Sequence, residues 1–132
     1  MTKILCFAGA ALAFLPGCMS YADDGVHAVQ WADIRVPKGM KLSTHLHQSN
    51  TLEVGDYRYA NLIYEGGRTP LQVASYLLET MPKHAYRLVS QENVAGGEQL
   101  IFQRGPHTST CTISNHERLT RLEIRVRTHP KL

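Results

Sequence analysis

Three arginines near the C-terminal end have the type and spacing needed to bind an anion. Arg121, Arg125 and Arg127 alternate with a leucine, an isoleucine and a valine. Alternate side chains of an extended strand project to the same face, so the guanidinium groups should lie together, opposite the apolar residues. Guanidinium groups bind phosphate and carboxylate through paired hydrogen bonds. The pattern predicts a surface for lipid phosphate, a glycan or an acidic partner. The alternative is an edge strand protected by charge against aggregation.

The seven histidines raise the question of a metal site. His45 and His47 would place two imidazoles on one side of an extended chain. A Zn²⁺ or Cu²⁺ site would need a third ligand, such as His27 or His116. Spacings typical of structural zinc sites are absent, so we expect solvated histidines and no bound metal. Periplasmic metal binding is the alternative.

Cys111 is the remaining side chain with nucleophilic chemistry. A reactive thiol needs a lowered pKa and partial exposure. Cys111 lies two residues from Ile113 and should point to the same face of its strand, which predicts that Cys111 is a small buried core residue instead. Walker and Gly-x-Ser-x-Gly motifs are absent. We therefore expect no catalytic residues, no cofactor and no enzymatic activity, with a thiol-dependent enzyme as the less favoured alternative.

The first residues have the pattern of an export signal. Lys3 precedes an uncharged, mostly apolar run over residues 4–15. This run is shorter than the roughly 20 residues that a membrane-spanning helix needs, but it suits a signal peptide. Pro16 and Gly17 then end any helix.

Two processing sites compete behind this run. Residues 15–18, Leu-Pro-Gly-Cys, resemble a lipobox, the signal of bacterial lipoproteins, which would place lipid on Cys18. Met19 follows in place of aspartate, and the resemblance then implies sorting to the outer membrane. The alternative is cleavage after Ala22, which fits the small-x-small rule and would release a soluble periplasmic protein.

Composition limits the remaining possibilities. We expect a signal peptide over residues 1–17, a tether over 18–31 and one domain over 32–132, a size that supports a single core. The formal charge of +3 falls to +2 when Lys3 is removed, which is too weak to indicate nucleic acid binding. Only Cys111 remains as a free thiol after lipidation, so no disulfide framework is expected.

One helix has a well-defined start. Thr69 can cap it, Pro70 suits its first position, and Gln72 can close a capping box. Apolar residues then recur at helical spacing until Pro82 ends the pattern.

Strand patterns surround this helix. One covers 57–64 before it, and four follow it at 86–91, 98–104, 108–115 and 121–127. A short strand should include Ile34 and Val36, and residues 45–55 should form a loop. The order β-α-β-β-β-β predicts an α+β fold, a two-layer sandwich with one helix on a mostly antiparallel sheet. The strands that flank the helix should be parallel.

Several short motifs resemble an uncharacterised family of small bacterial envelope domains, often lipoproteins. They are Val-Pro-Lys-Gly-Met at 36–40, Leu-Ile-Tyr-Glu-Gly at 62–66, Met-Pro-Lys-His at 81–84, Leu-Val-Ser at 88–90 and Cys-Thr-Ile at 111–113. The resemblance spans about residues 34–115 and carries no activity or catalytic residues. It implies an envelope lipoprotein that faces the periplasm. We therefore expect a non-enzymatic binding or structural module for another envelope component.

Overall fold

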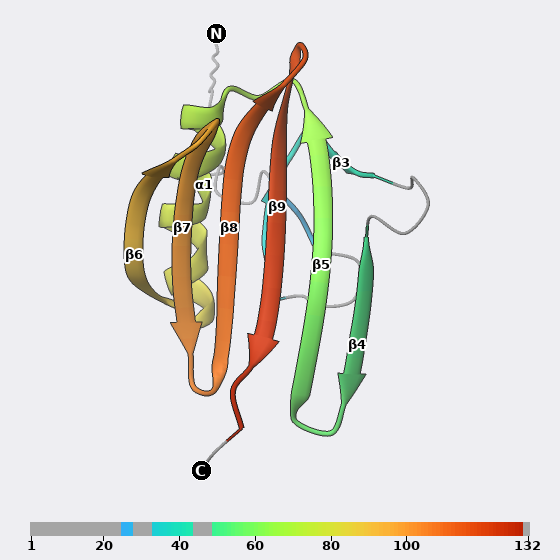
Figure 1. The fold of residues 1–132 in the computed structure, drawn as a ribbon, viewed down its shortest axis with the longest axis vertical. Coiled ribbons are helices and arrows are strands. Elements are labelled where there is room, and N and C mark those ends of the chain that lie inside the picture. The colour runs from blue at the N-terminus through green and yellow to red at the C-terminus, as the bar shows by residue number, and fades with distance from the viewer. Residues whose placement is uncertain (1–24, 28–32, 44–48, 131–132) are drawn as a thin grey trace, which may run out of the picture.

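The fold is built mainly from antiparallel strands. The computed structural model describes residues 25–27, 33–43 and 49–130 (Figure 1), and strands make up 61% of the structure. In chain order the elements are β1 (Gly25–His27), β2 (Arg35–Pro37), β3 (Met40–Leu42), β4 (Asn50–Val54), β5 (Tyr57–Gly66), α1 (Pro70–Thr80), the short 3-10 helix η3 (Met81–His84), β6 (Arg87–Val94), β7 (Gly97–Arg104), β8 (His107–His116) and β9 (Leu119–Thr128).

A seven-stranded sheet forms the larger layer. Its order is β3-β5-β9-β8-β7-β6, and β4 also pairs with β5. Every neighbouring pair is antiparallel. β3 and β4 lie end to end along one edge of β5, because β3 pairs with residues 64–66 and β4 with residues 57–61. The last strand, β9, therefore lies inside the sheet between β5 and β8.

The expected α+β fold, with one helix on the sheet in the order β-α-β-β-β-β, is wrong. The structure is a mostly antiparallel, β-sandwich-like fold with one short helix. β5 and β6 flank α1 but are not neighbours, because β9, β8 and β7 lie between them. A parallel pair did not form because the hairpins after β6 run back across the sheet, so that β9 takes the place beside β5.

Two segments expected to lack regular structure contain strands. Asn50–Val54 lies in the expected loop and forms β4, and Gly25–His27 lies in the expected tether and pairs with β2. Both strands are held by backbone hydrogen bonds to a neighbour. β4 is almost wholly exposed, so it carries no alternation of apolar and polar residues by which it could be recognised.

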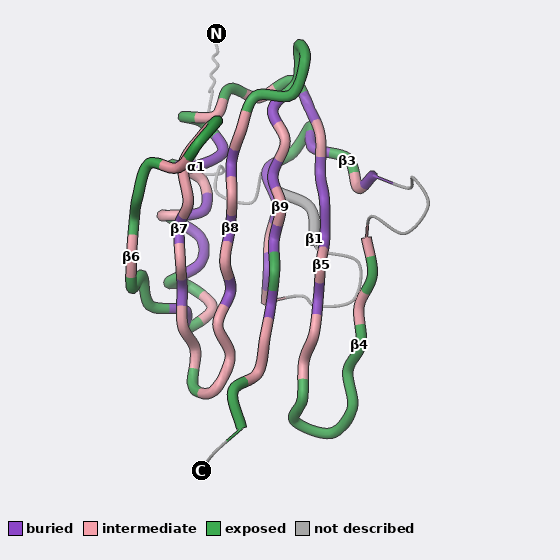
Figure 2. Tube along the Cα trace, in the orientation of Figure 1, coloured by how far each residue is buried: buried purple, intermediate pink, exposed green. Residues whose placement is uncertain are grey.

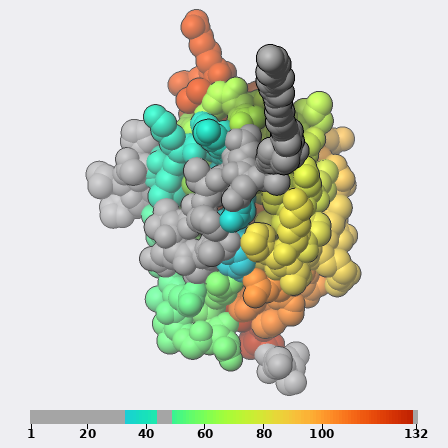
Figure 3. Space-filling view, turned by 180° about the vertical axis from the view of Figure 1, so that it is seen from behind, coloured from blue at the N-terminus to red at the C-terminus, as the bar shows by residue number. Residues whose placement is uncertain are grey.

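The core lies between the large sheet and a smaller layer behind it. This layer consists of α1 and the two-stranded sheet β1-β2 (Figures 1 and 3). α1 contacts β2, β8 and β9, and the buried segments follow the strands and the helix face between the layers (Figure 2). The fully buried side chains include Val36, Leu62, Val73, Leu77, Leu100, Phe102, Cys111, Ile113, Leu122, Ile124 and Val126.

The expected start of the helix is confirmed. Thr69 Oγ1 accepts a hydrogen bond from the Gln72 backbone amide at 3.1 Å, and Gln72 Oε1 accepts one from the Thr69 amide at 3.0 Å. Pro70 occupies the first turn.

The 3-10 helix that follows α1 ends at Ala85, whose φ of 68° places it in the left-handed region. This turn directs Tyr86 into the core, where its side chain is 2% exposed.

One glycine permits the close pairing of β3 with β5 within the large sheet. Gly66 lies at the end of β5 opposite Met40 of β3. A Cβ atom at Gly66 would lie 2.3 Å from the carbonyl oxygen of Gly39, closer than any side chain tolerates. The backbone of the turn before β3 can therefore approach β5 only because residue 66 has no side chain.

Replacing Thr69 with alanine should lower the free energy of unfolding by about 1 kcal/mol, because the substitution removes the N-cap hydrogen bond. Urea denaturation of the two proteins measures the difference. Thr69→Ser keeps the hydroxyl and should denature close to wild type. Equal midpoints for wild type and Thr69→Ala would show that the capping box contributes nothing to stability.

Candidate functional site

The arginines of β9 lie in the middle of the sheet. Arg121, Arg125 and Arg127 project from the face opposite the buried Leu122, Ile124 and Val126. Since β9 has paired neighbours on both sides, protection of an edge strand does not explain them. The edges of the sheet are β6 on one side and β3 with β4 on the other.

We call the side of the large sheet turned away from α1 the outer face. Among the described elements, none lies over it, because α1, β1 and β2 are all behind the sheet in Figure 1. Across β5, β9, β8 and β7, one row of this face runs Tyr59, Arg127, Thr108 and Gln103, and the next row runs Asn61, Arg125, Thr110 and Ile101. The face thus combines cationic, hydroxyl and amide groups with the carboxylates of Glu65 and Glu123.

The three arginines differ in how firmly they are held. Arg127 Nη1 donates to the carbonyl oxygens of Ala60 at 3.0 Å and Val126 at 2.9 Å. Its guanidinium carbon lies 4.1 Å from the centre of the Tyr59 ring, a cation-π contact. Arg121 Nη2 is 3.9 Å from a carboxylate oxygen of Glu65. Both residues are therefore partly fixed by their neighbours.

Arg125 is the most accessible of the three. Its side chain is 56% exposed, and its Nη2 lies 3.5 Å from Glu123 on the same strand. Such an exposed pair contributes little stability, so Arg125 can exchange this contact for an external anion at small cost.

A second cluster of charges lies between the two layers. Asp33 lies just before β2 and accepts two hydrogen bonds from Arg58 of β5. Arg58 Nη1 donates to Oδ2 at 2.8 Å, and Nη2 donates to Oδ1 at 3.4 Å. Arg104, at the end of β7, also donates to Oδ2. The Tyr86 hydroxyl donates to the same oxygen at 3.1 Å. One carboxylate thus joins the smaller layer to two strands of the sheet.

The environment shifts the pKa values of Asp33, Tyr86 and His107. Desolvation raises the pKa of Asp33, but hydrogen bonds and charge attraction, chiefly from Arg58, outweigh it and leave the pKa below the usual 3.8. Desolvation and the nearby Asp33 charge raise the pKa of Tyr86 to about 12. The pKa of His107 is lowered by desolvation and by the charges of Arg58 and Arg104. At neutral pH the cluster therefore contains an ionised Asp33, a neutral Tyr86 and a neutral His107.

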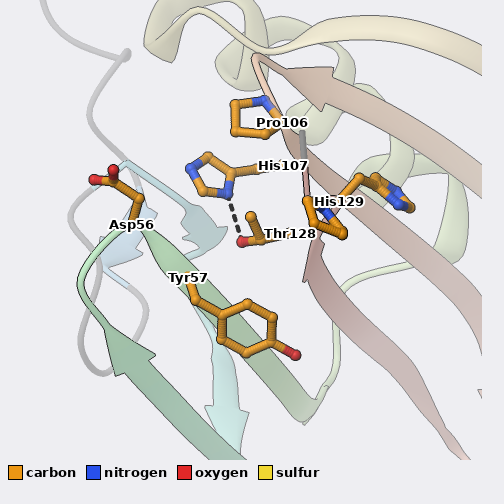
Figure 4. A pocket seen from close by; sticks show the side chains of 7 residues that line it. Asp56, Tyr57, Pro106, His107, Thr128 and His129 are labelled. Atoms are coloured by element: carbon orange, nitrogen blue, oxygen red, sulfur yellow. Dashed lines mark hydrogen bonds between the residues drawn. The ribbon is translucent and has the colours of Figure 1, made fainter. Parts of the chain in front are cut away.

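A surface cleft of about 600 Å³ adjoins this cluster (Figure 4). His107 Nδ1 and Thr128 Oγ1 are joined by a hydrogen bond of 2.8 Å on its wall. His129 is held by a bond from its amide to the Pro106 carbonyl at 2.8 Å. The lining residues are Asp56, Tyr57, Pro106, His107, Thr128, His129 and Pro130. With one carboxylate and two imidazoles, this cleft offers weaker anion recognition than the outer face.

The expected burial of Cys111 is confirmed. Its side chain is fully buried, and desolvation raises the pKa of the thiol to about 12. A thiol in this state is not a nucleophile at neutral pH. Cys111 therefore does not supply the reactive group on which the thiol-enzyme alternative depended.

Other expected positions are only partly described. Cys18, His45 and His47 lie outside the described residues, and His27 belongs to β1. His116 lies 3.9 Å from Glu65. Within residues 33–43 and 49–130, no group of three or more histidine, cysteine, aspartate or glutamate residues is placed to hold a metal ion. The described helices include none that is long and apolar enough to cross a membrane.

The cluster around Asp33 could not be recognised in the sequence. Asp33 is 25, 53 and 71 residues away from Arg58, Tyr86 and Arg104. No local pattern connects such distant positions. The cleft likewise joins the turn after β4 to the turn after β7 and to the end of β9. The outer-face arginines were predictable because they share one strand.

Comparison of the chain with protein-family models, curated proteins and solved structures found no match.

Replacing Asp33 with asparagine should lower the free energy of unfolding by about 2–4 kcal/mol, because Arg58 and Arg104 then lose the charge that compensates them. The contribution of Asp33 should depend on pH. Its folded pKa is lowered, so the stabilisation is complete above the unfolded value of 3.8 and is lost as the pH falls through the folded pKa.

Urea denaturation from pH 7 down into the acid range below 4 tests this account. The difference between wild type and Asp33→Asn should shrink as the pH falls. A difference that stays constant throughout would show that the carboxylate charge is unimportant. Glu53→Gln, which removes an exposed carboxylate 3.4 Å from Arg58, is the matched control and should have a much smaller effect.

Proposed function

We propose that this domain is a non-catalytic binding module of the bacterial cell envelope. The chain is tethered to the outer membrane by lipid on Cys18 and faces the periplasm. The outer face of its sheet recognises an acidic polysaccharide. The observation that carries this proposal is the position of Arg125, 56% exposed on a central strand of an uncovered sheet face.

The chemistry around the arginines supports a glycan. Two strands contribute polar side chains to the outer face. β8 contributes Thr108, Thr110, Thr112 and Ser114, and β7 contributes Gln99 and Gln103. Hydroxyl and amide groups both donate and accept hydrogen bonds, as sugar hydroxyls require. The arginines add sites for carboxylate groups. Antiparallel strands repeat side chains on one face about every 7 Å, so the array suits a polymer with regularly spaced groups.

A protein partner fits this face less well. Stable protein interfaces have an apolar centre within a polar rim. Here the exposed Leu52, Val54 and Tyr57 lie on the outer face but at its β4 edge, away from the middle strands. The other large exposed apolar side chains include Leu71 of α1 and Leu88 and Val89 of β6. Leu119, at the start of β9, is the remaining one. The centre of the outer face is instead polar, which favours a hydrated ligand.

Arg125→Glu should weaken binding to polygalacturonate, a polymer with one carboxylate on each sugar, by about tenfold or more, because a charge-assisted bond is replaced by repulsion. Binding of wild type should also weaken as the salt concentration rises. Titration calorimetry at two ionic strengths measures both effects. Neutral dextran should not bind under either condition.

Arg118→Glu is the matched control, because it makes the same change of charge in the β8–β9 turn and leaves Arg125 in place. It should bind the polymer within about twofold of wild type, since a charge beyond the Debye length is screened. Arg127→Gln is less informative, because it also removes the bonds to Ala60 and Val126. Equal affinity of wild type and Arg125→Glu, or no binding by wild type, would overturn the proposal.

A further inference from the structure

One end of the molecule gathers cationic side chains from three separate segments. The turn before β3 contributes Lys38, the segment between β5 and α1 contributes Arg68, and the β8–β9 turn contributes Arg118. We call this region, together with the row Lys41, Glu65 and Arg121 across β3, β5 and β9, the anchor-side end. It lies at the top of Figure 1.

Positive charge is in excess at the anchor-side end. Among the described residues, its five cationic side chains, Lys38, Lys41, Arg68, Arg118 and Arg121, outnumber the carboxylates, which are Glu65, Glu117 and, at the start of β7, Glu98. Glu65 is shared, because Arg121 Nη2 and His116 Nε2 both lie 3.9 Å from its Oε2. Lys38 and Arg118 are exposed in their turns. Arg68 Nε donates to the Lys38 carbonyl at 2.9 Å, which keeps these two cationic residues adjacent.

The opposite end of the sheet is closer to charge balance. There Arg58 and Arg104 surround Asp33, and Glu53 lies 3.4 Å from Arg58. Asp56 adds another carboxylate in the β4–β5 turn, and Arg87 and Arg127 add two cationic groups near this end. The excess of positive charge among the described residues is therefore larger at the anchor-side end than at the opposite end.

The register of β1 places the start of the described chain at the same end. Gly25 is paired with Pro37, which is followed directly by Lys38. Gly25 follows Cys18 by seven residues. Seven residues span at most about 25 Å even when fully extended. A lipid on Cys18 would therefore keep the anchor-side end close to the bilayer.

We propose that the anchor-side end rests on an anionic lipid surface, with Lys38, Arg68 and Arg118 against the headgroup phosphates. This inference depends on the lipid anchor of the proposed function. Two exposed apolar side chains border the cations, Leu71 at 74% and Leu119 at 43%, and apolar side chains beside basic ones suit a membrane interface. The strands then stand upright on the membrane, and the outer face points sideways into the periplasm, open to a glycan.

Proximity quenching of the processed protein in vesicles tests this orientation. The vesicles contain equal parts of phosphatidylglycerol and phosphatidylcholine, with a nitroxide on a fraction of the headgroups. A fluorophore is attached either at Leu119→Cys or, at the opposite end, at Asp56→Cys. Because Cys111 is buried, labelling is selective. Quenching should be at least about threefold stronger at residue 119 and should fall when salt screens the charges.

Variants with reversed charges distinguish docking of the anchor-side end on the lipid surface from tethering by the lipid alone. Lys38→Glu combined with Arg118→Glu should remove most of the difference between the two labels, and so should vesicles of phosphatidylcholine alone. Lys83→Glu combined with Arg87→Glu makes the same change of charge elsewhere and should leave the difference intact. Lys83 and Arg87 are exposed, so neither double variant should disturb the fold.

Three results would overturn the inference. They are equal quenching at the two labels in wild type, equal loss of quenching in both double variants, and an intact mass that shows no lipid on Cys18. Arg125→Glu should leave the quenching unchanged, and the double variant of Lys38 and Arg118 should still bind polygalacturonate. Failure of the orientation is thereby distinguished from failure of glycan binding.

Discussion

The Asp33 carboxylate is the contact that joins the two layers of this fold. It receives Arg58 from β5, Arg104 from the end of β7 and the Tyr86 hydroxyl from the segment before β6. These groups come from distant parts of the chain, and Asp33 and Arg58, at 15% and 19% exposed, would be costly to leave unpaired. The Arg104 guanidinium also lies 5.6 Å from the centre of the Tyr86 ring. Together they hold the segment that leads into β2 against the sheet.

This arrangement determines which face of the sheet is free. The small layer closes the inner face over Leu100, Phe102 and Ile124, all fully buried. The outer face then needs no cover, because the side chains of its central strands are mainly polar and these strands are paired on both sides. β9 contributes side chains to both faces of the sheet. Its apolar residues fill the core, and its arginines project from the outer face.

Local patterns predicted the parts of the structure that depend on neighbouring residues. The capping box of Thr69 and Gln72, the strands β7, β8 and β9, and the burial of Cys111 all follow from spacing within one segment. The order of strands was not predictable, because pairing of β5 with β9 joins residues about 60 positions apart. β4 was missed since its side chains are exposed and only its backbone fixes it in place. Asp33 was missed because its partners are distributed along the chain.

The arginines of the candidate site were predictable, but their place on a central strand was not. That place distinguishes a binding face from a protected edge.

Methyl NMR of the intact domain during titration with polygalacturonate tests the glycan-binding account most directly. The methyl groups of Thr108, Thr110 and Thr112 lie on the outer face, whereas those of Ile113, Leu122 and Ile124 lie in the core. The account predicts saturable shifts of the threonine signals, with the core signals nearly unchanged. Shifts confined to Thr128 in the cleft beside His107, or to core methyl groups, would contradict it.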